Sequence, residues 1–129
     1  MNDPIDLKAT YLHLTPRAEA VRLPVTESFW AELAEGCPVI DGWLYGVYAM
    51  AAGPWSNWER HPHGDEVLTM LSGAMDLTLE EKTGPRTVSM KAGDTVVVPA
   101  GIWHIGRVVV AGDLMALTFG KGTEHRPVS

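Results

Sequence analysis

Five side chains that can bind a metal ion crowd into one short stretch of the chain. They fall within eight positions and are Glu59, His61, His63, Asp65 and Glu66. Neutral imidazole and carboxylate groups together form mixed nitrogen and oxygen sites for divalent transition metals. Residues two apart on a β-strand point to the same side, so Glu59 with His61, or His61 with His63, can converge on one ion. The stretch is compatible with a metal site, although an exposed polar loop between strands would have the same composition and is the more frequent explanation.

His104 is a further candidate ligand in a second stretch. It follows the turn-forming residues Pro99, Ala100 and Gly101 and opens a run of apolar residues. A buried imidazole needs a partner, which is either a metal ion or a hydrogen bond to the backbone. The two stretches together favour a metal more than either does alone.

The elements that must position these residues are β-strands. Beyond residue 42, short aromatic and β-branched segments alternate with Gly, Pro and Asp, a pattern typical of a sandwich or barrel. In one segment Met75, Leu77 and Leu79 alternate with polar residues, which predicts an antiparallel strand buried on one face, and residues 82–86 predict a hairpin turn after it. No helix separates the strands, so parallel crossovers are not expected. The expected strands are 43–51, 66–72, 74–81, 87–91, 95–99, 103–110 and 114–119.

The segments outside the strands complete one domain. Residues 26–35 predict a single short helix, with Thr26 or Ser28 as its N-cap and Gly36 as its stop. We therefore expect an N-terminal arm with that helix at 1–42, a barrel at 43–119 and a C-terminal tail at 120–129 that covers the barrel or frays. A chain of 129 residues has room for one such fold.

Composition excludes several function classes. The formal net charge is −6, and the basic residues form no patch that could neutralise successive phosphates, so we expect no nucleic acid partner. No apolar run approaches the roughly 20 residues that cross a bilayer, so we expect a soluble protein that does not bind membranes. A single cysteine, Cys37, and an N-terminus without a signal pattern indicate a cytoplasmic protein.

Two motifs in these stretches resemble those of the cupin superfamily, which run G-x5-H-x-H-x3,4-E-x6-G and G-x5-P-x-G-x2-H-x3-N. The second motif is matched at every position but the last, where Val108 replaces Asn. The matching residues of the two motifs are His61, Glu66 and Gly73, then Gly93, Pro99, Gly101 and His104. The resemblance implies an antiparallel double-stranded β-helix, the jelly-roll barrel, and a homodimer. It also implies a divalent transition metal, with Fe, Mn, Ni and Zn all open.

The first motif departs from the family at the first His position, which Glu59 occupies. Two ligand sets follow: His61, Glu66 and His104 are joined either by Glu59 or by His63. We favour Glu59, because the Pro-His-Gly-Asp run at 62–65 predicts a chain already turning away from the strand. A third possibility is a metal-free polar pocket in which Glu59 accepts a hydrogen bond from His61.

Strand alternation predicts the lining of the barrel. If His104 points inward, so do Val108 and Val110, while Arg107 points outward. Glu66 and Met70 share a face by the same rule. The candidate substrate-pocket residues are Tyr45, Trp58, Met70, Trp103 and Val108. Their character predicts a small apolar or aromatic ligand.

Two functions from different classes fit these residues. In the first, a metal acts as redox centre or Lewis acid in a dioxygenase, isomerase or cyclase of cupin type, with Glu66 or Glu59 as the catalytic base. In the second, the barrel binds a small ligand without catalysis, with no metal or a vestigial metal site. Metal analysis distinguishes the two.

Overall fold

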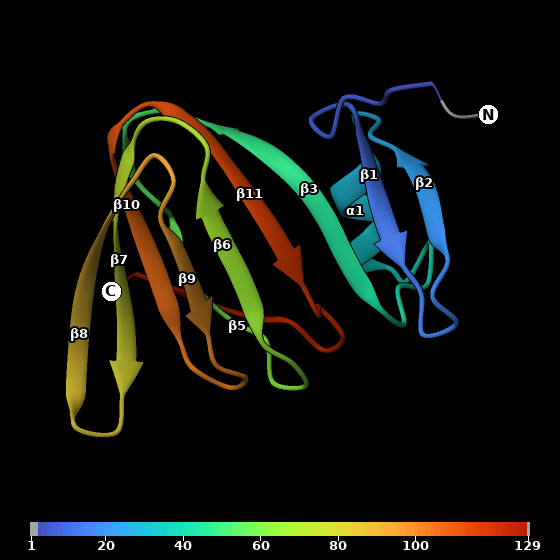
Figure 1. Cartoon of the computed structure of the whole chain (residues 1–129). Helices are drawn as coiled ribbons and strands as arrows, with labels where there is room; N and C mark the ends of the chain where they lie inside the picture. The colour runs from blue at the N-terminus through green and yellow to red at the C-terminus, as the bar shows by residue number, and fades with distance from the viewer. Residues whose placement is uncertain (1–2, 129) are drawn as a thin grey trace.

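The computed structural model describes residues 3–128, which form one helix and twelve strands (Figure 1). The helix is α1 (Phe29–Ala34). The strands are β1 (Thr10–Leu14), β2 (Ala20–Pro24), β3 (Trp43–Met50), β4 (Gly53–Pro54), β5 (Asn57–Arg60), β6 (Glu66–Met70), β7 (Ala74–Glu81), β8 (Gly84–Lys91), β9 (Thr95–Val98), β10 (His104–Val110), β11 (Gly112–Thr118) and β12 (Glu124–Pro127). The expected all-β class with one short helix is confirmed.

The strands form two sheets that face each other. The first has the order β2-β1-β3-β11-β6-β9 and the second β12-β5-β10-β7-β8, with β4 also paired to β10. Every strand pair among residues 3–128 is antiparallel, as expected for a jelly-roll barrel. Consecutive strands alternate between the sheets at several points, so residues far apart in sequence meet inside the barrel.

The main core lies between the two sheets. In β7, Met75, Leu77 and Leu79 are at most 1% exposed, so the predicted alternation holds. Leu68 and Leu114 face them from the other sheet and are equally buried. Burying side chains of this size contributes about 1.5–3 kcal/mol each, which makes the paired sheets the main source of stability.

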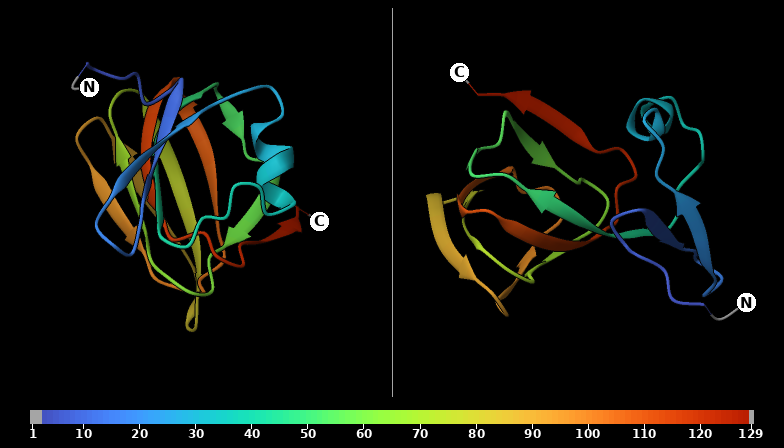
Figure 2. Two further views of the ribbon diagram at one scale, coloured as in Figure 1. Left: turned by 90° about the vertical axis from the view of Figure 1, so that its right-hand side faces the viewer. Right: turned by 90° about the horizontal axis from the view of Figure 1, so that it is seen from above.

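The N-terminal segment differs from a simple arm, because β1 and β2 form a hairpin that extends the first sheet beyond β3. Figure 2 shows this hairpin and α1 together at one end of the molecule. Tyr11 packs edge-to-face on Phe29 and Tyr48, with ring centroids 5.2 and 5.3 Å apart. Gly46 makes this possible, since a Cβ there would lie 2.6 Å from the Tyr11 ring. The arm is therefore a second small core joined to the barrel.

Strand β10 differs from the sequence prediction in which of its side chains point into the barrel. His104 and Val108 are buried as predicted, but Val110 is 56% exposed. The pairing of β10 with β7 shifts by one residue between Val108 and Val110, which marks a β-bulge. A bulge inserts an extra residue, so the alternation that holds before it reverses after it.

Strand β12 forms from the expected tail, which therefore does not fray. Residues 124–127 pair with β5, and Glu124 lies opposite Arg60. The sequence also predicted no strand at β1, β2, β4 or β5, which are short and carry polar residues or proline. The hairpin between β7 and β8 is tighter than expected, since Glu81 already pairs with Gly84.

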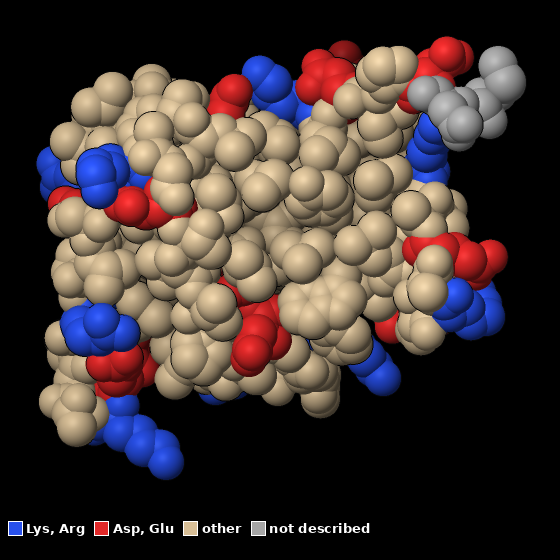
Figure 3. All heavy atoms as spheres, in the orientation of Figure 1, with Lys and Arg blue, Asp and Glu red and all other residues tan. Residues whose placement is uncertain are grey.

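Charged side chains on the face shown in Figure 3 lie mainly around the rim, with acidic and basic groups close together. The area over β6, β11 and β3 is largely uncharged, apart from acidic side chains near its lower edge.

Among residues 3–128, no helix has the length and hydropathy required to cross a membrane.

Candidate metal centre

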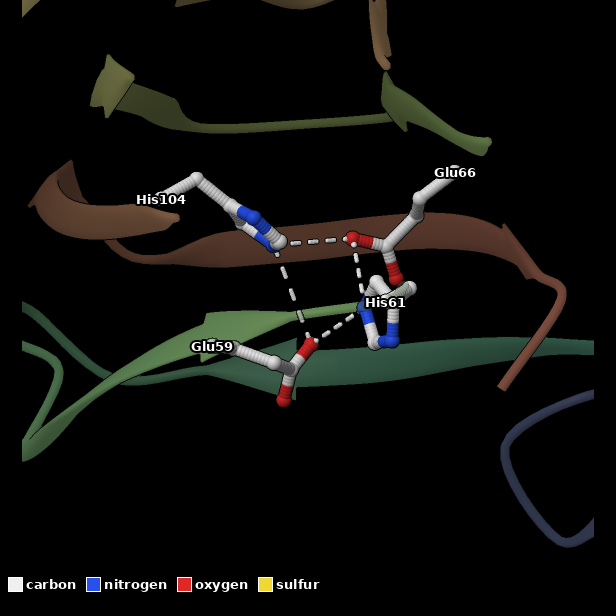
Figure 4. A group of neighbouring side chains, drawn as sticks. All are labelled: Glu59, His61, Glu66 and His104. Carbon is white, nitrogen blue, oxygen red and sulfur yellow. Dashed lines mark ion pairs between the residues drawn. The ribbon is translucent and has the colours of Figure 1, made fainter. Parts of the chain in front are cut away.

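Four side chains converge at one end of the barrel, where strands of both sheets begin or end. Glu59 is in β5 and His61 follows that strand directly. Glu66 is the first residue of β6, and His104 is the first residue of β10. Glu59 and His104 are also cross-strand partners. Figure 4 shows the four side chains pointing toward one another.

Turns on either side hold this end of the barrel together. The Gly101 N–H donates to the His61 carbonyl at 2.9 Å, and the Ala100 N–H donates to the Asp65 carboxylate at 2.9 Å. Gly101 has a φ of 80°, which an L side chain rarely adopts. Asp65 is exposed and serves this link between loops rather than the ligand group.

The ligand atoms of this group are close and mostly buried. One atom each from Glu59, His61, Glu66 and His104 all lie within 4.8 Å of one another. The His61 Nε2 is 2.8 Å from Glu59 Oε1 and 3.3 Å from Glu66 Oε1, and the His104 Nε2 is 3.1 Å from Glu66 Oε1. These contacts are not aligned hydrogen bonds: the two Nε2 atoms and Glu66 Oε1 are buried without a hydrogen-bond partner. Buried polar atoms of this kind are costly unless something binds them.

The other nitrogen of each imidazole has a partner that fixes the proton. The His104 Nδ1 is 3.1 Å from the Ile102 carbonyl, which only accepts, so Nδ1–H donates. The Thr123 hydroxyl donates to the Gly120 carbonyl at 2.7 Å, so it accepts from the His61 Nδ1–H at 2.8 Å. Both neutral rings then present an unprotonated Nε2 to the centre. Hydrogen bonding of this kind orients imidazole ligands in metal sites.

The two carboxylates are held differently. Glu66 is buried, and its Oε2 accepts a hydrogen bond from the Thr118 hydroxyl at 2.6 Å, which leaves Oε1 for the centre. The Glu59 side chain is 30% exposed, and its Oε2 lies 3.3 Å from the His125 Nε2 on β12. Glu66 is therefore the more firmly held carboxylate and Glu59 the more accessible one.

The charges in this group shift two pKa values strongly. Burial lowers the pKa of His61, but contacts with Glu59 and Glu66 outweigh burial and raise it to about 9. Burial raises the pKa of Glu66, but contacts with His104 and His61 outweigh it and lower that pKa to about 2. The negative charge of the site therefore attracts a cation, which is a proton on His61 when no metal is bound.

The remaining predicted site residues lie elsewhere. His63 is exposed beside Gly122, so the structure brings Glu59 rather than His63 to the group. Trp58 and Trp103 stack with arginines on the outer side of their sheet. The Tyr45 hydroxyl donates to the Met115 sulfur on the other outer face. Met70 and Val108 belong to the buried core.

Several residues near the group were missed by the sequence analysis. Thr118 and Thr123 carry no signal of their own, and His125 lies in a segment that was not expected to form a strand. Tyr48 shares the inner face of the first sheet through its pairing with Leu114. Burial raises the pKa of Tyr48, and electrostatic interaction with Tyr11, Glu66 and Glu59 raises it further, which keeps the hydroxyl neutral.

The donor set fits a divalent transition metal. Two imidazoles and a carboxylate are the ligands of many Fe(II) and Zn(II) sites, and Glu59 adds a second carboxylate. A surface hollow of about 270 Å³ lies on the outer face of β7, β8 and β10, away from this group. The four-residue group is therefore identified as a candidate site by its ligand chemistry and not by a surface hollow.

Comparisons with known proteins agree with the fold. A cupin-2 domain containing protein from Shewanella frigidimarina is 18% identical, with 59% of this chain and 69% of that chain covered and a TM-score of 0.51. A conserved protein of unknown function from Streptococcus pyogenes is 28% identical, covering 58% and 61%, with a TM-score of 0.51. Fe(II)-HppE with an alternative substrate is 17% identical, covering 60% and 42%, with a TM-score of 0.50.

The similarity to HppE extends over less than half of that protein, so it concerns the fold alone. No curated protein matches the sequence. The family model for the cupin domain matches residues 46–120, more than half of the chain. The matched region runs from within β3 to just beyond β11 and includes all four residues of the group. The chain therefore belongs to the cupin-domain family.

Proposed function

We propose that this protein is a small metal-dependent cupin that acts on a small organic molecule, with Glu59, His61, Glu66 and His104 holding a divalent transition metal. The main support is that three of these ligand atoms are buried, converge on one point and lack hydrogen-bond partners. A divalent cation would satisfy all three at once. When bound, such a metal supplies Lewis acidity or redox chemistry of the kind that dioxygenases, isomerases and cyclases use.

The protein's own residues divide the remaining work. Glu66 is buried and tied to Thr118, which suits a permanent ligand. Glu59 is partly exposed and contacts His125, which suits a carboxylate that can leave the metal and accept a proton from substrate. We therefore assign the general base to Glu59 rather than Glu66. The apolar interior excludes water and favours an apolar or aromatic substrate.

A second candidate is a metal-free barrel that binds a small ligand by hydrogen bonds alone. The contact of 2.8 Å between His61 and Glu59 favours it, because a protonated His61 can neutralise one of the two carboxylates without a metal. Fe, Mn, Ni and Zn remain the metals to test.

Elemental analysis of the untagged protein, reconstituted with each metal in turn, separates the two. We expect about one equivalent per chain in the wild type and loss of the metal in His61→Ala and His104→Ala. His63→Ala, which removes an exposed histidine, is the matched control and should keep the metal, whereas Glu59→Gln should weaken binding. A metal-free wild type would overturn the proposal, and metal loss in His63→Ala alone would overturn the ligand set.

We also propose a cytoplasmic homodimer. An apolar row of cross-strand neighbours on the outer face of the first sheet supports pairing with a second copy. The row consists of Leu12, Tyr45, Leu117, Val67 and Val97. The single exposed cysteine, Cys37, supports a reducing compartment. A monomer mass in sedimentation velocity would overturn the dimer.

A further inference from the structure

Trp55 carries the one remaining unsatisfied polar group of the interior. Among residues 3–128, four buried side-chain nitrogen or oxygen atoms lack a hydrogen-bond partner. Three are ligand atoms of the metal centre described above, and the fourth is Trp55 Nε1. A metal bound at this centre would account for three of the four atoms and would leave the indole N–H unexplained.

The indole lies inside the barrel, next to the metal centre. The backbone N–H of Trp55 donates to the Gly106 carbonyl at 2.9 Å, and Pro54 pairs with Arg107, so Trp55 is opposite Gly106 on the same face of the sheet. Gly106 is two residues after His104 on β10, and both face inward. The Trp55 and His104 ring centroids are 6.4 Å apart.

Close packing fixes the nitrogen-bearing edge of the ring. A Cβ at Gly106 would lie 2.7 Å from Trp55 Cε2, the carbon bonded to Nε1, and 2.8 Å from the Met75 sulfur. The ring therefore lies across Gly106, against the inner surface of the sheet. Glycine at this position leaves room for the indole.

Packing alone does not explain why the ring carries a donor. Phenylalanine would cover a glycine on the neighbouring strand as well, and a buried tryptophan N–H usually finds a partner. Leaving a buried donor unpaired costs about 1–3 kcal/mol. An indole N–H can only donate, so the group that fits beside it is an acceptor.

We propose that Trp55 Nε1–H donates a hydrogen bond to an acceptor oxygen of the small ligand that occupies the metal centre. The inference rests on the proposed function and names its ligand class: a small carboxylate or carbonyl compound. Two carboxylates balance a divalent metal, and the buried charged or polar side chains among residues 3–128 include no Lys or Arg. Such an interior accepts a neutral or singly charged oxygen ligand and disfavours a polyanion such as a phosphate ester.

The test compares two probes on the Co(II)-loaded protein, followed through its visible absorption. Acetate offers one oxygen to the metal and a second to an N–H donor, whereas imidazole binds metals but offers no second acceptor. We expect Trp55→Phe to weaken acetate binding about tenfold, the effect of losing one hydrogen bond to a charged group. Imidazole and Co(II) affinities should stay unchanged. Trp103→Phe, on the outer face, should behave as the wild type toward both probes.

Unchanged acetate affinity in Trp55→Phe, with Co(II) still bound, overturns this inference alone. A wild type that takes up no Co(II) overturns the proposed function and this inference with it. If Trp55→Phe does not fold, the wild-type protein decides. The chain has five tryptophans, so the Zn(II) form labelled with ¹⁵N-tryptophan gives five indole N–H signals. We expect acetate to move the signal with contacts to Gly106 and Met75 downfield; acetate binding that leaves this signal fixed overturns the inference.

Discussion

Strands β5 and β10 place polar side chains on both faces of their sheet, and these side chains differ in whether they have partners. On the inner face, Glu59 and His104 belong to a group in which three buried atoms have no hydrogen-bond partner. On the outer face, Arg60 lies 4.6 Å from the centre of the Trp103 ring and pairs with Glu124 at 2.6 Å. The same two strands thus place an unsatisfied polar group on one side and a satisfied one on the other.

The outer group attaches the C-terminal strand. Arg126 of β12 stacks between Trp58 and Trp103, at 5.0 and 4.7 Å from their ring centres, and pairs with Glu80 at 2.7 Å. Exposed ion pairs contribute little stability individually. Their effect here is to orient β12, which carries His125 toward Glu59. The difference between the faces teaches that satisfied charged groups position the chain, whereas unsatisfied buried polar atoms mark the candidate metal centre.

The largest expected effect comes from removing the hydroxyl that accepts the hydrogen bond of His61. Thr123→Val removes the acceptor for the His61 Nδ1–H, so we expect metal affinity to fall about 10- to 100-fold. The matched control is Thr87→Val, which removes an exposed hydroxyl bonded to Thr78 at 2.8 Å. Competition with a chelating indicator measures both affinities. Equal affinities in the two variants would contradict the assigned tautomer of His61.

The next effect is a pH dependence that only the inward group should show. A metal must displace the His61 proton, whose pKa is raised to about 9 without metal. Below this pH, metal affinity should fall about tenfold per pH unit, with one proton released on binding. Calorimetric titration in buffers of different ionisation enthalpy counts that proton. Binding at pH 7 without proton release would contradict the charge state assigned to the metal-free site.

His61 and Glu66 also determine how the stability of the metal-free protein depends on pH. Because the pKa of His61 is raised from 6.5, its contribution is full below pH 6.5 and is lost as pH rises through about 9. Because the pKa of Glu66 is lowered from 4.5, its contribution is present above pH 4.5 and is lost as pH falls through about 2. Urea denaturation should therefore show maximum stability between about pH 4.5 and 6.5.

The smallest effect concerns the outer face. Trp58→Ala removes one of the two rings that contact Arg126, while Trp103 and Glu80 still hold that side chain. We expect a small fall in thermal stability and unchanged metal affinity. A loss of metal affinity as large as in Thr123→Val would mean that the two faces are not independent.

Much of the barrel was predictable because its strands are locally consistent. Met75, Leu77 and Leu79 alternate with polar residues, and the structure buries all three. Strands β5 and β12 were missed because their sequences, NWER and EHRP, are short and charged. Their strand conformation depends on pairing with each other and on the outer stack of rings and arginines. Val110 was placed wrongly because a bulge does not alter the apolar pattern.

The sequence by itself indicated the fold class and a ligand group of His61, Glu66 and His104 with either Glu59 or His63, because strand alternation and motif spacing are local properties of the chain. The tertiary structure decided what surrounds them. Thr118 contacts Glu66 and Thr123 contacts His61, although the two residues of these pairs are 52 and 62 positions apart in the sequence. His125 of the C-terminal strand contacts Glu59. Strand pairing between distant segments, which no local pattern encodes, sets which imidazole nitrogen is free and which carboxylate is accessible.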